Sequence, residues 1–269
     1  MKHLTLWTLA WGCLWSASAA VAQDGLINPN DERLRLSAGV FAADSRTELR
    51  LDSDAGTLGT LVNAEQDLGL RDHSDAGDVE VELRVRDRHR IRFNYFKLDR
   101  NASQALSRQI RFGDDVYNVN DVVTSAIDMR NFGVTYSYEF LRFERYELGA
   151  SFGVNLVELD ATAAVAARNI REQESRTGPT PTVGVHTLFR ITKRIHAELR
   201  AEYMQLHIDD FEGTVTNLRG ALIYRFNDSL GVGLGYALLE TEVESEQLQD
   251  TGRFSIANDG ALLFVRVAF

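Results

Sequence analysis

Segments in which apolar and polar residues strictly alternate recur along the chain after residue 32. In the segment Val79–Arg86, for example, apolar residues alternate with Glu80, Glu82 and Arg84. Because successive side chains of a β-strand point to opposite faces, this alternation predicts strands with one apolar and one polar face. Proline, which interrupts strand pairing, occurs only three times in the whole chain. The pattern therefore predicts an all-β fold made of antiparallel strands.

The last alternating segment reaches the C-terminus. Within Gly260–Phe269 the odd-numbered positions are apolar, whereas Arg266 lies on the opposite face. A strand of about ten residues that ends in an aromatic residue resembles the closing strand of bacterial outer-membrane β-barrels. In that family the barrel assembly machinery reads the C-terminal aromatic residue. The resemblance therefore implies that Phe269 is an assembly signal and that this machinery is a partner.

The first 22 residues have the character of a secretory signal peptide, so we expect residues 1–22 to be removed. Lys2 begins a short polar start, Leu4–Leu14 is apolar, and Ala20-Val21-Ala22 fits the small-x-small pattern of a cleavage site. The apolar run is shorter than the roughly 20 residues that a membrane-spanning helix needs. Cys13, the single cysteine, leaves a lipoprotein leader as the alternative.

The expected mature chain lacks the features of several protein classes. It contains no cysteine, so neither a disulfide framework nor a cysteine-based metal site is available. The formal net charge of the full sequence is −10, which is unsuited to a nucleic acid partner. No apolar run after the leader is long enough for a membrane-spanning helix. A membrane location therefore requires a closed β-barrel, which satisfies every backbone group internally.

Ten alternating segments follow one another and are joined by four tight turns and five longer loops. We expect strands at residues 33–43, 79–86, 90–95, 131–140, 146–156, 183–191, 195–203, 218–226, 230–238 and 260–269. The tight turns are expected at Asp87–His89, Leu141–Arg145, Thr192–Arg194 and Asn227–Ser229. Polar segments near 44–76, 100–121 and 161–178 are expected to be loops, and Thr47–Asp52 with Leu58–Glu65 to form a hairpin above the membrane. If that hairpin entered the membrane, the barrel would have 12 strands.

An even number of strands, with short turns at one end and long loops at the other, is typical of outer-membrane barrels. The sequence thus resembles small barrels of the OmpA and OmpW type. It predicts a single antiparallel up-and-down transmembrane β-barrel at 33–269 after an N-terminal segment at 23–32. The resemblance implies a bacterial outer-membrane location, with the N-terminus and tight turns in the periplasm and the loops outside the cell. Outer-membrane lipids and lipopolysaccharide would be its partners.

The aromatic residues indicate which strand face is outside. A soluble lipocalin-like barrel or a β-sandwich would show the same alternation with its apolar face inside. Phe132 and Phe140 would lie about 26 Å apart at ~3.3 Å per residue, close to the ~25 Å apolar band of a membrane barrel. Aromatic residues on the apolar faces form two groups that fit the girdles at the two lipid–water boundaries. They are Phe140, Tyr146, Phe189, Tyr224, Phe226 and Phe269 near the turns, and Tyr95, Phe132, Tyr203 and Tyr236 near the loops.

If the apolar faces contact lipid, the polar faces line the lumen. Buried charges without partners are costly, so we expect ion pairs that fill the lumen in place of an apolar core. The alternative is a narrow charge-lined passage, for which the glycine strip at 231–235 leaves room. The expected lumen network consists of Arg35, Glu80, Glu82, Arg84, Arg92, Glu139, Glu147, His186, Arg190, His196, Glu198, Arg200, Glu202, Arg219, Arg225 and Arg266.

The loops offer few candidates for chemistry. Asp52–Gly56 begins like a calcium loop but lacks the remaining ligands, so we expect a solvated turn and no metal site. His207 with Asp209, and Asp114 with Asp115, superficially resemble the catalytic pairs of the omptin proteases, which are also ten-stranded outer-membrane barrels. The order of His207 and Asp209 is reversed, however, and both lie on the apolar face rather than in a shared cleft. We therefore expect no catalytic residues and no cofactor.

The sequence thus predicts a non-enzymatic outer-membrane barrel with a largely charge-filled lumen. Its expected role is to contribute to envelope integrity or surface contact. A narrow porin-like channel for ions or small solutes is the alternative, and an omptin-like hydrolase is a more distant one.

Overall fold

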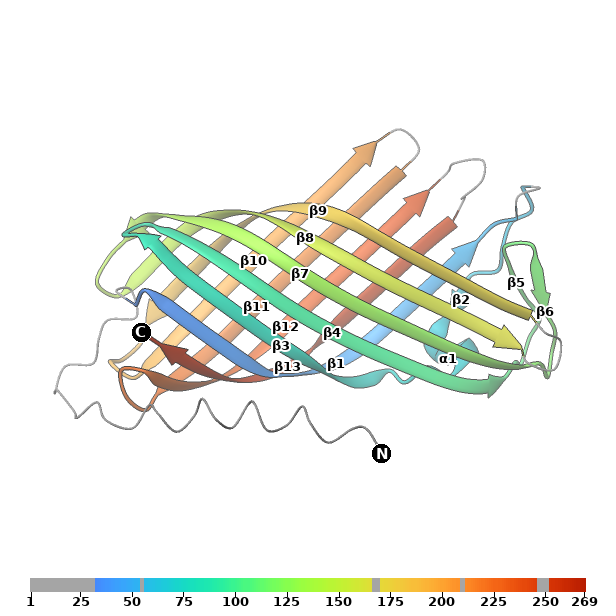
Figure 1. Ribbon diagram of the computed structural model, residues 1–269, viewed down its shortest axis with the longest axis horizontal. Coiled ribbons are helices and arrows are strands. Elements are labelled where there is room, and N and C mark those ends of the chain that lie inside the picture. Colours follow the sequence, from blue (N-terminus) through green and yellow to red (C-terminus); the bar gives the residue numbers. More distant parts are fainter. Residues whose placement is uncertain (1–31, 54–55, 166–169, 209–210, 246–251) are drawn as a thin grey trace, which may run out of the picture.

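The structure is a computed structural model that describes residues 32–53, 56–165, 170–208, 211–245 and 252–269. The expected signal peptide at 1–22, and all but the last residue of the expected segment at 23–32, lie outside these residues. The described chain forms one elongated barrel (Figure 1). In this part of the chain, no helix is long and apolar enough to cross a membrane.

Ten long antiparallel strands form the wall, each paired with the next in chain order. The last strand closes on the first through a register that runs from Arg35↔Ala268 to Leu51↔Gly252. The long strands are β1 (Leu34–Leu51), β3 (His73–Arg86), β4 (His89–Ala105), β7 (Val122–Arg142), β8 (Tyr146–Val165), β9 (Ile170–Arg190), β10 (Ile195–Ile208), β11 (Phe211–Arg225), β12 (Leu230–Ser245) and β13 (Gly252–Ala268). The short elements are β2 (Val62–Asn63), helix α1 (Ala64–Leu68), β5 (Ile110–Phe112) and β6 (Asp115–Tyr117).

The predicted fold class and the count of ten strands are confirmed. The alternative with 12 strands is wrong, because Thr47–Leu51 continues β1 and Leu58–Glu65 contains only β2 and the start of α1. The expected hairpin forms in part, since Asn63 and Val62 pair with Glu48 and Leu49 of β1.

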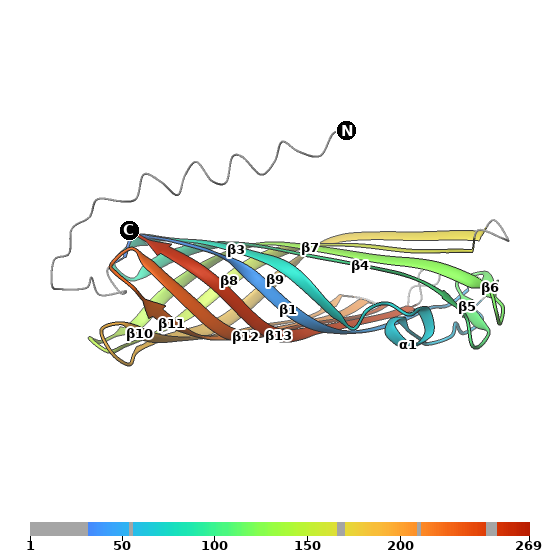
Figure 2. The same ribbon diagram turned by 90° about the horizontal axis from the view of Figure 1, so that it is seen from below.

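The two ends of the barrel differ in their connections. Connections of two to four residues join β3 to β4, β7 to β8, β9 to β10 and β11 to β12 at one end, which we call the turn end. The C-terminus lies there too, and the Phe269 N–H donates to the Leu34 carbonyl at 2.9 Å. At the opposite end, the loop end, β4, β7, β8 and β9 extend further than β10 to β13 (Figure 2). The wall is therefore taller on one side.

Several strands are longer than the sequence alternation predicted. Residues 44–51, 100–105, 161–165 and 170–178 were expected to be loops, but they belong to β1, β4, β8 and β9. In β1 and β8 the prediction was wrong because alternation does not stop at these points but continues with the apolar and polar faces exchanged.

Strand β7 shows this exchange of faces. Phe132 is exposed and faces outward, whereas Met129 and Ile127, further toward the loop end, are buried and face inward. On the outer face at that level Arg130 pairs with Glu158 of β8 at 3.0 Å, and both side chains are more than two-fifths exposed. The half of the barrel next to the turns, the turn half, is thus apolar outside and polar inside. The loop half is polar outside and mostly apolar inside, like a soluble barrel, with a buried ion pair of Arg100 and Glu65 beside helix α1.

Helix α1 covers part of the loop end. Asn63 is its N-cap, with its side-chain oxygen accepting from the Gln66 N–H at 2.8 Å. The Asp67 carboxylate accepts from Arg108 Nε at 2.8 Å and Nη2 at 2.6 Å. These hydrogen bonds from Arg108 lower the pKa of Asp67 below its ordinary value. Ala64 packs with Leu70 and with Ile127 of β7, so the helix joins the apolar interior of the loop half.

Candidate functional site

A network of ion pairs fills the turn half of the lumen. At its centre the Arg90 guanidinium contacts Glu82 at 2.6 Å, Glu147 at 3.1 Å and Glu139. Glu82 also pairs with Arg35 at 3.0 Å. Arg90, Glu139 and Glu147 are almost fully buried, so each charge has exchanged its water for an opposite charge.

Further ion pairs cross the lumen between strands that are not neighbours in the wall. The barrel shape explains this, because inward side chains of opposite walls meet at the axis of a narrow barrel. The crossing pairs are Arg266–Glu198 at 2.5 Å, Arg200–Glu80 at 2.7 Å, Arg219–Asp78 at 3.0 Å, and Arg92–Glu202.

The remaining residues expected in the network also occupy inward positions of their strands. Arg225 pairs with Glu32 at 2.9 Å, and Arg190 pairs with Glu144 at 3.3 Å at the exposed turn end. Arg84 Nη2 lies 3.9 Å from Glu147. His186 and His196 have buried ring nitrogens without a hydrogen-bond partner among the described residues.

Two network carboxylates were missed by the sequence analysis. Glu32, assigned there to the N-terminal segment, pairs with Arg35 at 2.8 Å inside the lumen. Asp78 accepts two hydrogen bonds from Arg219, both at 3.0 Å. Asp78 directly precedes the alternating segment Val79–Arg86, so extending that pattern by one residue would have found it.

The glycine strip at 231–235 is covered at its middle residue. The Phe264 ring lies against Gly233, where a Cβ would be only 2.1 Å from the ring Cζ. The guanidinium groups of Arg219 and Arg266 lie 5.6 and 5.2 Å from the ring centroid, which is cation–π distance. At the turn end, the void beside Glu32 measures about 20 Å³, room for about one water molecule.

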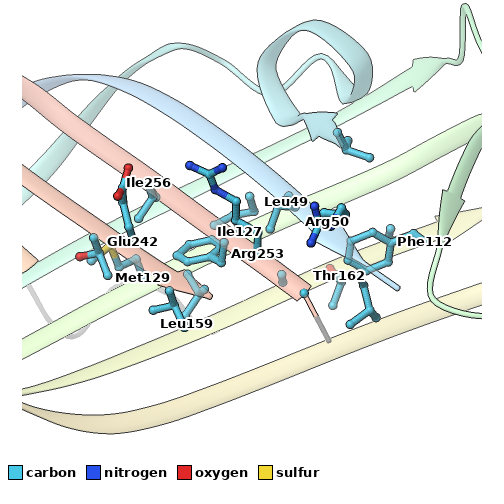
Figure 3. A pocket seen from close by; sticks show the side chains of 18 of the residues that line it. Leu49, Arg50, Phe112, Ile127, Met129, Leu159, Thr162, Glu242, Arg253 and Ile256 are labelled. Atoms are coloured by element: carbon cyan, nitrogen blue, oxygen red, sulfur yellow. The ribbon is translucent and has the colours of Figure 1, made fainter. Parts of the chain in front are cut away.

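Toward the loop end the lumen becomes apolar. A buried layer that includes Phe41, Phe96, Leu98 and Phe264 lies next to the ion pairs. Beyond it is a cavity of about 500 Å³, lined by side chains from most of the wall and from the loops (Figure 3). Its apolar lining includes Leu49, Ile127, Met129, Leu159, Phe254 and Ile256. This cavity differs from the largely charge-filled lumen that the sequence predicted.

The cavity offers few polar groups to a ligand. Arg50, Glu242 and Arg253 border it, but they stand at outward positions next to inward Leu49, Val243 and Phe254 (Figure 3). Ser125 is different, because it occupies an inward position of β7 and is only 2% exposed. Its hydroxyl has no hydrogen-bond partner among the described residues.

A sequence signal for the cavity does exist. In β7 the buried residues Val123, Ile127 and Met129 have odd numbers, whereas the outward apolar residues Phe132 and Val134 have even numbers. A switch of the apolar residues from even to odd positions within one strand therefore marks the point at which the apolar face changes sides. If the apolar residues are expected to stay on one face, the strand is ended at that point and the rest is assigned to a loop.

The loop candidates do not form a site in the described part of the chain. His207 is exposed on the outer face, in register with Glu212 of β11, and Asp209 lies outside the described residues. Asp114 is exposed on the β5–β6 turn. Asp52 accepts from the Gly59 N–H at 2.8 Å, and Asp54 lies outside the described residues. No group of three or more His, Cys, Asp or Glu residues among those described is placed to hold a metal ion.

Comparison with solved structures identifies the fold. The outer-membrane protease OmpT from Escherichia coli matches with a TM-score of 0.56 at 9% identity, over 92% of this chain and 100% of that one. The attachment invasion locus protein Ail of Yersinia pestis matches with a TM-score of 0.39 at 8% identity, over 88% and 99%. A Pseudomonas aeruginosa FadL homologue matches with a TM-score of 0.40 at 7% identity, over 89% and 90%. No family model and no curated protein matches the sequence.

At this low identity the likeness concerns the fold alone. The closed ten-stranded barrel, its outward apolar band and its similarity to OmpT agree with one another. The chain has the fold of a transmembrane outer-membrane β-barrel, as the sequence predicted.

Proposed function

We propose that this protein is a non-enzymatic outer-membrane barrel that binds a small, uncharged, largely apolar molecule in the loop half of its lumen. The observation that carries the proposal is the cavity of about 500 Å³ with its apolar lining. This volume lies within the ~300–1,000 Å³ typical of small-molecule sites. Burial of apolar ligand surface contributes roughly 25 cal/mol per Å², which favours such a ligand over water.

Ser125 narrows the ligand class. Its register partners on β4 and β8 are Ala102 and Ala163, which offer no side-chain acceptor. A buried hydroxyl without a partner is unfavourable by about 1–3 kcal/mol, so an oxygen atom on the ligand would be stabilising there. An apolar chain with one hydroxyl or carbonyl group, such as a long-chain alcohol, fits both the lining and Ser125.

The ion-pair network supports binding rather than conduction. The crossing pairs Arg200–Glu80 and Arg266–Glu198, together with the Phe264 ring, occupy the lumen between the cavity and the turn end. A narrow channel, the alternative function, would require these buried pairs to separate, and unpaired buried charges are costly. The outward position of His207 likewise argues against an omptin-like hydrolase, because general-base chemistry needs its groups in one cleft.

The proposed orientation puts the loop half outside the cell and the turns in the periplasm. The exposed charged pairs of the loop half, such as Arg130–Glu158, suit an aqueous surface among lipopolysaccharide head groups. Phe269, exposed at the turn end, would be read there by the barrel assembly machinery. A contribution to envelope integrity or surface contact stays a prediction.

Photolabelling tests the binding function. The protein in lipid nanodiscs is irradiated with a long-chain alcohol that carries a diazirine, and the labelled peptides are mapped by mass spectrometry. We expect saturable labelling around Met129 and Leu159, which unlabelled alcohol competes away. Labelling that fails to saturate and is confined to outward residues such as Leu222 and Leu234 would remove the proposal.

A further inference from the structure

The wall of the barrel opens between β9 and β10, beside the cavity. Strands β9 and β10 pair from His196↔Arg190 to Tyr203↔Val183, and no pair follows among the described residues. Beyond that point Met204–Ile208 pair only with β11, and Ile170–Thr182 pair only with β8. The two strands diverge toward the loop end in both views (Figures 1 and 2). We call this opening the β9–β10 fork.

Proline explains why pairing ends at the fork. Pro179 and Pro181 stand on the described edge of β9, just past Val183, and neither has an N–H to donate. Pairing with β8 continues through both, as Leu156↔Pro179 and Val154↔Pro181. A strand tolerates proline where the missing donor faces away from its partner, so the lost donors lie on the edge toward β10.

The fork joins the cavity to the lipid-facing surface. Residues of both unpaired edges line the cavity: Pro179 and Thr180 from β9, and Met204 and Leu206 from β10. On the outside the last paired residues, Tyr203 and Val183, are exposed.

The fork also lies at the level of the membrane boundary. Tyr203 belongs to the aromatic residues nearest the loop half. Leu156 and Val154, the β8 partners of the two prolines, are exposed apolar residues. The β9 side of the fork thus borders the apolar band itself.

We propose that the β9–β10 fork is the route by which the apolar ligand moves between the cavity and the outer leaflet of the membrane. This inference rests on the proposed binding function. A route through water would expose the apolar molecule to solvent, which is unfavourable. A lateral opening in the wall lets the molecule pass from the bilayer to the cavity in contact with apolar surface. The ion-paired turn half below the cavity blocks movement toward the turn end.

Crosslinking across the fork tests the route. Residues 23–269 contain no cysteine, so introduced cysteines can be crosslinked without interference from native thiols. Pro181→Cys with Gln205→Cys puts two outward thiols where the ladder would continue. They are joined by oxidation, or by a short bismaleimide if the strands stay too far apart for a disulfide. The control is Val185→Cys with Ala201→Cys, a pair already in register within the closed wall.

The measurement is labelling of Leu159 by the diazirine alcohol, supplied in two ways. In one arm the probe is dissolved in the bilayer, and in the other it is delivered from water as a cyclodextrin complex. We expect the fork crosslink to slow labelling from the bilayer at least ten-fold and to leave labelling from water unchanged. The control crosslink should change neither.

Three other outcomes would count against the route. Equal labelling with and without the fork crosslink would place access at the loop mouth. Equal loss in both arms would show that the crosslink acts on the cavity itself. If the uncrosslinked protein is labelled in neither arm, the binding function fails as well, which separates that failure from failure of the lateral route alone.

Discussion

At the scale of single residues, Arg90 is one of the arginines that balance several carboxylates in the lumen. Its guanidinium is the shared partner of Glu82, Glu139 and Glu147, which come from β3, β7 and β8. Arg90→Met keeps most of the side-chain volume but leaves these carboxylates without that charge. Breaking a buried ion pair in this way typically costs about 3–5 kcal/mol. We expect a loss of that size in the free energy of unfolding, measured by urea titration followed by circular dichroism.

The matched control for Arg90 is Arg130, which pairs with Glu158 on the exposed outer face of the loop half. Exposed ion pairs contribute roughly 0–1 kcal/mol, so Arg130→Met should change stability little. Equal effects of the two substitutions would contradict the view that the lumen network stabilises the barrel.

Asp67 provides a pH-dependent attachment of helix α1. Its pKa lies below the ordinary value of 3.8 in the folded protein because Arg108 hydrogen-bonds the ionised carboxylate. A lowered carboxyl pKa contributes stability above the unfolded pKa, and this contribution is lost as the pH falls through the folded pKa.

We therefore expect Asp67→Asn to speed hydrogen exchange of the Ala64–Leu68 amides relative to the wild type at pH 7. The difference between the two proteins should shrink as the pH falls below 3.8 and through the lowered pKa of wild-type Asp67, where the carboxylate loses its charge. A difference that persists unchanged at low pH would show that the Arg108 pair is not the cause.

At the scale of strands, the sequence was informative wherever the apolar face meets lipid. Alternation such as that of Phe132 to Phe140 located all ten strands of the turn half and their turns. It failed in the loop half, because residues such as Met129 and Leu159 are apolar on the opposite parity. The outer face of the wall changes from apolar to polar there, and the inner face changes in the opposite sense. The full lengths of β1 and β8 therefore could not be predicted from alternation that keeps its apolar face on one side.

The contact between β12 and β13 at Gly233 makes a further prediction. The Phe264 ring lies where a Cβ of residue 233 would be, and the ring is held between Arg219 and Arg266. Gly233→Ala should displace the ring and destabilise the barrel by about 1–3 kcal/mol, as overpacking usually does. Gly77→Ala is the control, since a Cβ there meets no atom within 4 Å. Chemical unfolding of both variants checks this, and a neutral Gly233→Ala would show that the ring has room to move.

At the scale of the whole molecule, the sequence could predict that ion pairs form in the lumen, but not which residues pair with each other. Charges of both signs at inward positions implied pairing, yet only the closed wall decides that Arg92 reaches Glu202, 110 residues away. The cavity was beyond the sequence for a similar reason, since its lining comes from strands far apart in the chain.

Because side chains fill the turn half of the lumen, we expect the protein not to conduct ions. In planar bilayers the wild-type protein should give no stable unitary conductance, because Phe264 and the crossing ion pairs fill the lumen. Phe264→Ala exposes the glycine strip at 231–235 and should be the variant most prone to leak. Steady conductance of the wild type would instead support the channel alternative.

The most direct test of ligand binding in the loop half compares two alanine positions of β8. Ala161 borders the cavity, whereas Ala164 has the opposite parity and does not. Affinity for an uncharged long-chain alcohol is measured by titration calorimetry in nanodiscs for the wild type, Ala161→Trp and Ala164→Trp. We predict at least a ten-fold weaker affinity for Ala161→Trp, because the indole fills the cavity, and no change for Ala164→Trp. Unchanged affinity of a correctly folded Ala161→Trp variant would contradict the cavity as the binding site.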